Sequence, residues 1–155
     1  MLKYAGTDIV FQEFPDEVTL AINLTRCPNN CPGCHSAYLK EDAGPVLDEV
    51  ALLSLIADYR DEITCVGLMG GDGDPEGVMH LMDTVRLTYG TKLRTGWYSG
   101  RDELPKDFRA ELFDYVKLGP YIEECGPLSA QTTNQRMYRV EGGKLNDITY
   151  RFQKK

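Results

Sequence analysis

Apolar residues along the chain follow two alternating patterns, one typical of buried strands and one typical of amphipathic helices. Short apolar runs predict strands at 18–25, 63–70, 92–98 and within DYVKLGPY, ending at Gly119. Between these runs, apolar residues recur at the spacing of a helix face. This spacing predicts helices at about 48–60 and 75–89, and a short helix near 107–113. Strands that alternate with helices predict an α/β fold with a mostly parallel sheet.

The ends of the predicted elements carry local signals of their own. Asp48 and Asp74 are suited to cap the first turns of the two longer helices, and Pro75 suits a first helical position. The remaining apolar stretches are weaker. They predict strands at 135–140 and 147–152 with a turn at 141–147 between them, and a further strand at 8–14.

The size of the chain limits the architecture. Its 155 residues suit one domain, 1–155. A complete (β/α)₈ barrel takes about 250 residues, and this sequence offers four strand–helix units at most. We therefore expect a partial (β/α) barrel or open sheet of minimal size. Each predicted strand is followed by polar or turn residues: the cysteines, then GGDGD, YSG and GPY. We expect these four motifs to meet at one edge of the sheet.

Charge and composition exclude some functions. The net charge is −7, and the densest basic stretch, KLRTGWYSGR, holds three basic residues, so nucleic acid is not an expected partner. The sequence has no apolar run long enough for a membrane span and no secretory signal. We therefore expect a cytoplasmic protein, in which thiols stay reduced and a disulfide is disfavoured.

Three cysteines lie close together in CPNNCPGCH, at Cys27, Cys31 and Cys34. A structural zinc site usually has four protein ligands, and the second CxxC pair of a zinc ribbon is absent here. Cys65 lies in a predicted buried strand and Cys125 in a predicted loop, so neither is an expected fourth ligand. The spacing favours an iron–sulfur cluster with one open iron over a zinc site, and leaves both open.

The CxxxCxxC motif after the first parallel strand resembles the radical S-adenosylmethionine (SAM) superfamily. Within it, the chain resembles the activating enzymes of anaerobic (class III) ribonucleotide reductases. The similar segments are CPNNCPGCH, MGGDGDPEGV, TGWYSG, DYVKLGPYIEECGPL and TTNQRMYRV. The resemblance implies that Cys27, Cys31 and Cys34 bind a [4Fe–4S] cluster whose fourth iron chelates SAM. It also implies a flavodoxin-like electron donor and reductive cleavage of SAM to a 5′-deoxyadenosyl radical. That radical takes a hydrogen from a glycine of the reductase.

The resemblance also suggests residues around SAM. Gly70, Gly71 and Asp72 stand where the superfamily has its GGE motif, which approaches the methionine moiety. Asp74 is an alternative to Asp72 as the carboxylate near the SAM ammonium, and capping the following helix is its other interpretation. Tyr98 and Ser99 end a strand and are candidate SAM contacts, and a role in the turn is their other interpretation. Gly33 replaces the usual aromatic residue before the third cysteine, and His35 or Tyr38 is a candidate to pack on the adenine in its place.

The sequence also suggests interpretations of other polar residues, and other functions. Lys117 is expected on a solvated edge, His80 on an exposed helix face, and Trp97 in packing. Residues 134–136 are expected either to contact a partner or to form a polar turn. The rival functions are a radical SAM enzyme for a small molecule or for another glycyl-radical enzyme, and a zinc-stabilised interaction domain.

Overall fold

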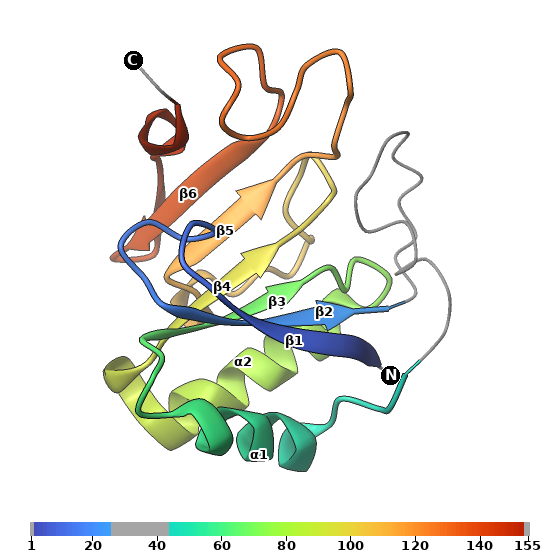
Figure 1. Cartoon of the computed structure of the whole chain (residues 1–155), viewed down its shortest axis with the longest axis vertical. Coiled ribbons are helices and arrows are strands. Elements are labelled where there is room, and N and C mark those ends of the chain that lie inside the picture. The colour runs from blue at the N-terminus through green and yellow to red at the C-terminus, as the bar shows by residue number, and fades with distance from the viewer. Residues whose placement is uncertain (1, 26–43, 154–155) are drawn as a thin grey trace.

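The computed structural model describes residues 2–25 and 44–153. Seven strands form one sheet in which each strand lies beside the next in the sequence (Figure 1). The strands are β1 (Tyr4–Val10), β2 (Thr19–Leu24), β3 (Cys65–Met69), β4 (Arg94–Tyr98), β5 (Tyr115–Leu118), β6 (Arg136–Glu141) and β7 (Lys144–Asp147).

The sheet is mixed. Strands β2 to β5 are parallel neighbours, as the sequence predicts. At both edges the pairing is antiparallel, because β1 pairs with β2, β5 with β6 and β6 with β7 through antiparallel registers. The predicted α/β class is therefore confirmed, and the prediction of a mostly parallel sheet holds only for the four central strands. Antiparallel neighbours need no crossover helix between them, which explains why both edges of the sheet gain strands without helices.

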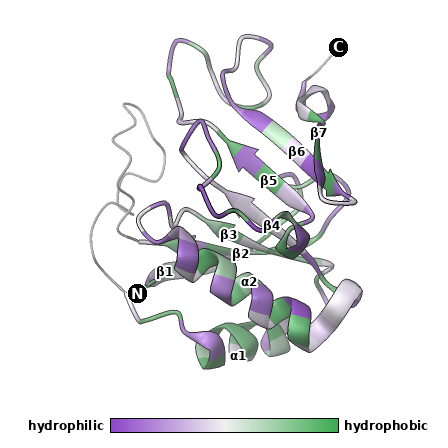
Figure 2. Ribbon diagram, turned by 180° about the vertical axis from the view of Figure 1, so that it is seen from behind, coloured by the Kyte–Doolittle hydropathy of each residue, from purple (hydrophilic) through white to green (hydrophobic). Residues whose placement is uncertain are grey.

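Two helices cover one face of the sheet, α1 (Glu49–Tyr59) and α2 (Pro75–Tyr89) (Figures 1 and 2). Their N-caps are the predicted ones: Asp48 accepts from the Ala51 amide and Asp74 from the Gly77 amide. α1 connects β2 to β3, and α2 connects β3 to β4. Because both right-handed crossovers run in the same direction across the sheet, both helices lie on the same face. The third predicted helix is only a single 3₁₀ turn, η3 (Ala110–Leu112).

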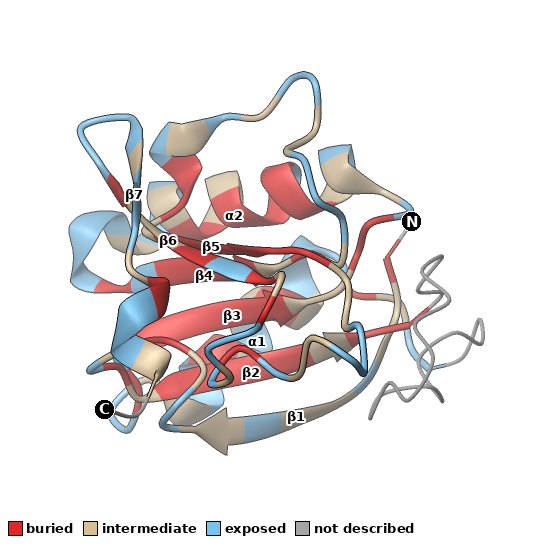
Figure 3. Cartoon of the chain, turned by 90° about the horizontal axis from the view of Figure 1, so that it is seen from above, coloured by how far each residue is buried: buried red, intermediate tan, exposed pale blue. Residues whose placement is uncertain are grey.

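The main core lies between the helices and this face of the sheet, which we call the helix face. Alternate residues of the central strands point into it and are buried. Figure 3 shows the central strands largely in red, the colour of buried residues. They pack against the apolar stripes of the helices. The strand side contributes Leu20, Ile22, Leu24, Val66, Leu68 and Val116, and the helix side Leu52, Ile56, Val78, Met82 and Val85.

The opposite face of the sheet, the loop face, is partly covered by residues 11–17, which we call the 11–17 loop. Phe14 of this loop is fully buried against glycines of two neighbouring strands. A Cβ atom on Gly96 would lie 2.3 Å from Cζ of Phe14, and one on Gly67 would lie 2.8 Å from Cε2. The two glycines therefore create the space that the Phe14 ring fills. A second core cluster gathers around this ring: Phe14, Cys65, Tyr115, Leu128 and Met137.

The structure corrects two predicted strands. The N-terminal strand begins earlier, at Tyr4, and ends at Val10, so residues 11–14 belong to the loop. The tail pairs through a tight turn at Gly142 and Gly143, both at positive φ, which places β7 at residues 144–147 instead of 147–152. Residues 149–152 form a 3₁₀ turn, where Thr149 Oγ1 accepts from the Met137 amide.

Among the helices in the described ranges 2–25 and 44–153, none combines the length and apolar character that a membrane crossing requires.

Candidate functional site

The candidate site lies at the carboxyl edge, the edge of the sheet where β2, β3, β4 and β5 end. The segments that follow β3, β4 and β5 are hydrogen-bonded to one another there. The Gly70 amide donates to Tyr98 O at 2.9 Å, and the Ser99 amide donates to Lys117 O at 2.8 Å. Three of the four motifs that the sequence places at this edge therefore meet in the structure.

Asp72 ties the end of β3 to the end of β4. Its carboxylate accepts from Ser99 Oγ at 2.6 Å and from the Gly100 amide at 2.8 Å. Ser99 Oγ in turn accepts from the Arg101 amide at 3.1 Å. Asp72 is only 3% exposed, so these bonds to its charged oxygens lie away from bulk water, where each contributes more than at the surface. Asp72 therefore fixes the shape of the loop after β4.

The two glycines before Asp72 adopt positive φ values, 104° at Gly70 and 90° at Gly71. A Cβ on Gly71 would lie 2.6 Å from Cγ2 of Val78 and 2.8 Å from Cδ1 of Leu24. The need for glycine at 71 therefore comes from close packing against the core. Gly70 has more space, and its carbonyl accepts from the Trp97 indole at 2.6 Å.

Asp74 caps α2, which is one of the two roles that the sequence suggests for this residue. Its Oδ1 accepts from the Gly77 amide at 3.0 Å, and its carbonyl accepts from the Val78 amide at 3.1 Å. A Cβ on Gly77 would lie 2.4 Å from Asp74 Oδ2, so the cap requires glycine at that position.

Tyr98 lies on the loop face at the end of β4. Its hydroxyl donates to Glu13 O of the 11–17 loop at 2.6 Å, and its ring contacts Phe14 edge-on at a centroid distance of 5.3 Å. Burial, and secondarily the nearby Glu13 charge, raise the pKa of Tyr98 far above its ordinary value. Tyr98 is therefore a neutral hydrogen-bond donor near neutral pH.

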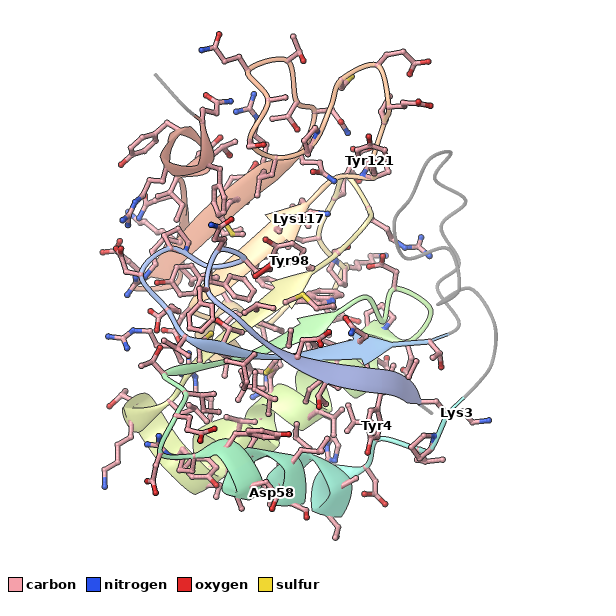
Figure 4. All side chains as sticks on the ribbon, viewed as in Figure 1. Lys3, Tyr4, Asp58, Tyr98, Lys117 and Tyr121 are labelled. Carbon is pink, nitrogen blue, oxygen red and sulfur yellow. The ribbon has the colours of Figure 1, made fainter. Side chains whose placement is uncertain are left out.

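Lys117 is the main residue that the sequence reasoning missed. Predicted on a solvated edge, it is only 7% exposed. Its ammonium donates to Ser99 O at 3.1 Å and Gly119 O at 3.0 Å, and lies 5.3 Å from the centroid of the Tyr98 ring (Figure 4). Lysine is rarely buried unless its charge is compensated. Here a positive charge joins the ends of β4 and β5 at the carboxyl edge.

The register places four side chains in one row across the loop face near this edge. Asn23 pairs with Met69, Met69 with Tyr98 and Tyr98 with Lys117 on successive parallel strands. Since residues opposite one another in register point to the same face of a sheet, the row forms a continuous wall. The 11–17 loop lies over part of this row, because the Tyr98 hydroxyl donates to Glu13 O.

A cleft of about 1010 Å³ opens at the carboxyl edge. Asp72 and Ser99 line it together with the buried side chain of Trp97, and the segments 100–106 and 120–122 form its walls. Lys106 and Arg101 bring positive charge, and Tyr121 brings an aromatic ring. The cleft thus combines charged, hydroxyl and aromatic groups beside the ends of three parallel strands, where α/β proteins bind ligands.

The polar residues after the cleft hold the connection between β5 and β6. Asn134 Nδ2 donates to Pro120 O at 2.9 Å, and Gln135 Nε2 donates to Gly119 O at 3.5 Å. Arg136 begins β6 and is exposed. Two of the three residues at 134–136 therefore stabilise a polar turn, which is one of the two roles predicted for them from the sequence.

The predicted cluster ligands Cys27, Cys31 and Cys34, and the predicted adenine contacts His35 and Tyr38, lie outside the described residues. The described residues on either side of this stretch of sequence are anchored. The Thr25 amide donates to Lys3 O at 2.9 Å, and Pro45 O accepts from the Tyr4 amide at 3.1 Å. Since Tyr4 pairs with Leu24 at the end of β2, Thr25 and Pro45 both lie near the carboxyl edge.

Two other predictions are confirmed. Cys65 is fully buried, and burial raises the pKa of its thiol well above the ordinary value, which makes it an inert core residue. His80 is exposed and contacts Glu49 between the helices. Within residues 2–25 and 44–153, no three His, Cys, Asp or Glu side chains form a group that could hold a metal ion.

Replacing Lys117 by methionine should lower the free energy of unfolding by about 1–3 kcal/mol, because the buried carbonyls of Ser99 and Gly119 lose a charged donor. Urea unfolding monitored by circular dichroism measures this change. Lys106→Met is the matched control, since Lys106 is exposed and should change stability by less than about 0.5 kcal/mol. Equal stabilities of the two variants would show that the Lys117 bonds contribute nothing.

Comparison with known protein families, with curated proteins and with solved structures found no match for this chain.

Proposed function

We propose that this protein is a radical SAM activase that cleaves SAM reductively at a [4Fe–4S] cluster and generates a glycyl radical on an anaerobic ribonucleotide reductase. The observation that carries the proposal is the position of CxxxCxxC in the sequence, directly after β2. The described residues on either side of it, Thr25 and Pro45, bond to Lys3 and Tyr4 beside the carboxyl end of β2. Asp72, Ser99 and Lys117 converge at the same edge.

The donor set fits a cubane cluster with an open position. Three thiolates would hold three irons, and the fourth iron would remain for an external ligand. When bound, the cluster supplies the electron for reductive cleavage of SAM. The buried ammonium of Lys117 at the same edge favours anionic groups nearby, both a thiolate-ligated cluster and the carboxylate of SAM. The chain itself would exclude water from the site, orient SAM and supply the charge of Lys117.

The carboxyl edge offers SAM a prepared surface. We assign the nucleoside to the cleft, where Tyr121 supplies an aromatic ring and Ser99 a hydroxyl. Gly70 leaves room for close approach to the backbone, since a Cβ there would meet only ordinary contacts. Asp72 acts indirectly in this scheme, because its oxygens accept from Ser99 Oγ and the Gly100 amide and hold these groups at the cleft wall.

The fold supports a barrel-type enzyme of minimal size. Strand order follows the sequence, and both helices lie on one face, as in the walls of (β/α) barrels and unlike doubly wound sheets. We infer a partial barrel of the radical SAM type. A partial barrel leaves one side of the site open, which suits a protein substrate, and a flavodoxin-like donor would deliver the electron.

The decisive experiment is anaerobic reconstitution followed by reduction with dithionite in the presence of SAM. We expect about four iron and four acid-labile sulfide per chain, and 5′-deoxyadenosine as the product. Adding the reductase should yield the electron paramagnetic resonance signal of a glycyl radical. One zinc per chain with no sulfide would overturn the proposal in favour of a zinc-stabilised domain. 5′-Deoxyadenosine without a radical on the reductase would point to another substrate.

A further inference from the structure

Gly70 joins β3 to the turn that borders the cleft, and both polar groups of its main chain are bonded to β4. Its amide donates to Tyr98 O at 2.9 Å, and its carbonyl accepts from the Trp97 indole N–H at 2.6 Å. The first bond joins main-chain atoms, so it does not depend on the side chain at position 98. The second needs a ring N–H, which only tryptophan and histidine side chains have. Trp97 therefore makes a contact with Gly70 that apolar packing alone does not require.

The turn after β3 has little stiffness of its own. Gly70 and Gly71 are consecutive glycines at positive φ, 104° and 90°. Because glycine has more backbone freedom than any other residue, fixing two in a row costs much conformational entropy. The bonds from β4 to Gly70 offset part of that cost at the start of the turn. At its end, the Asp72 carboxylate accepts from Ser99 Oγ and the Gly100 amide. The turn is thus held at both ends by β4 and the residues that follow it.

Neighbouring aromatic rings set the orientation of the indole. The Trp97 ring stacks on Phe113 with centroids 5.8 Å apart and an interplanar angle of 25°. Phe113 stacks in turn on Phe108, at 5.1 Å and 15°. Trp97 and Phe113 are both buried. In this orientation the ring N–H points at Gly70 O, so the donor is preorganised for that one acceptor.

Trp97 also lines the cleft, beside Asp72 and Ser99. We propose that Trp97 is a positioning residue for the ligand of the cleft. Its indole N–H fixes the turn from Gly70 to Asp72, and through Asp72 the turn sets the shape of the cleft wall at Ser99 and Gly100. This inference rests on the proposed function, which makes SAM the ligand. It gives Trp97 a role beyond the packing that the sequence predicts.

The test uses the fact that the chain has a single tryptophan. Growth of a tryptophan auxotroph on benzothienylalanine therefore changes position 97 alone, to a ring of nearly the same shape in which sulfur replaces the N–H. The wild type, this benzothienyl protein and Trp97→Phe are reconstituted anaerobically, and equilibrium dialysis measures their SAM affinity. SAM affinity should fall about three- to tenfold in both altered proteins, the effect of one lost hydrogen bond. Their iron and sulfide content should equal that of the wild type.

Phe108→Leu is the matched control for packing. It removes the outer ring of the stack and leaves both the Trp97–Phe113 contact and the bond to Gly70 in place. We expect a lower melting temperature with wild-type SAM affinity. Hydrogen–deuterium exchange gives a local readout, because amides 70–73 should exchange faster in the two proteins without the ring N–H and at the wild-type rate in Phe108→Leu.

Wild-type SAM affinity in the benzothienyl protein would overturn the inference, whatever Trp97→Phe shows, because the shape of the ring would then be sufficient. An equal loss of affinity in Phe108→Leu would also overturn it, since the effect would follow packing alone. Both results leave the proposed function intact. Failure of the reconstituted wild type to bind SAM would overturn the proposed function, and this inference with it.

Discussion

Replacing any one of Cys27, Cys31 and Cys34 by alanine should reduce dithionite-driven formation of 5′-deoxyadenosine to the level of a reaction without protein. Two remaining thiolates cannot hold three irons of a cubane, so the open iron and the position for SAM are lost together. The fold should survive each replacement. Both hydrophobic clusters found among the described residues are built from other side chains.

Iron and sulfide analysis after anaerobic reconstitution checks this result alongside the cleavage assay, and circular dichroism checks the fold. Cys125→Ala is the matched control, since Cys125 is a free cysteine in a loop after β5 and should keep both cluster and cleavage. Full iron content with full cleavage in any of the three alanine variants would contradict the assignment. An equal loss in Cys125→Ala would show that a fourth cysteine takes part.

Much of the carboxyl edge could be predicted because its signals are local. Asp48 and Asp74 stand directly before apolar helical stripes, and both cap helices as expected. Parallel strands read as short apolar runs, and the residues that follow them must share an edge, which brought GGDGD, YSG and GPY together. The antiparallel edges were harder, since β7 depends on a tight Gly142–Gly143 turn inside a stretch that reads as polar.

The residues that the sequence did not reveal depend on contacts between distant segments. Lys117 reads as a solvated lysine until the ends of β4 and β5 place Ser99 O and Gly119 O around its ammonium. Glu13 reads as part of a strand until Phe14 anchors the 11–17 loop over glycines more than fifty residues away. The alternation of residues along these strands indicates which side faces the helices. It does not show which loop covers the other side.

Replacing Asp72 by alanine should have a large effect on stability. In Asp72→Ala, the Ser99 hydroxyl and the Gly100 amide lose a charged acceptor in a site that is 3% exposed. The free energy of unfolding should fall by about 2–5 kcal/mol, since each charge-assisted hydrogen bond contributes about 1.5–3 kcal/mol. Urea unfolding measures the change. Asp58→Ala, on the exposed side of α1, should change stability by less than about 0.5 kcal/mol (Figure 4).

The affinity for SAM decides whether Asp72 acts through the loop or contacts the ligand. Equilibrium dialysis at a temperature where every variant is folded should show a weaker affinity in Asp72→Ala, in Ser99→Ala and in the double variant. If Asp72 acts by holding Ser99, the double variant should lose little more than either single variant, because both remove one shared bond. Additive losses, with the larger one in Asp72→Ala, would contradict this and place the carboxylate on SAM itself. Asp72 would then be the ligand that the GGE resemblance suggests, and the hydrogen bond to Ser99 would serve to orient it.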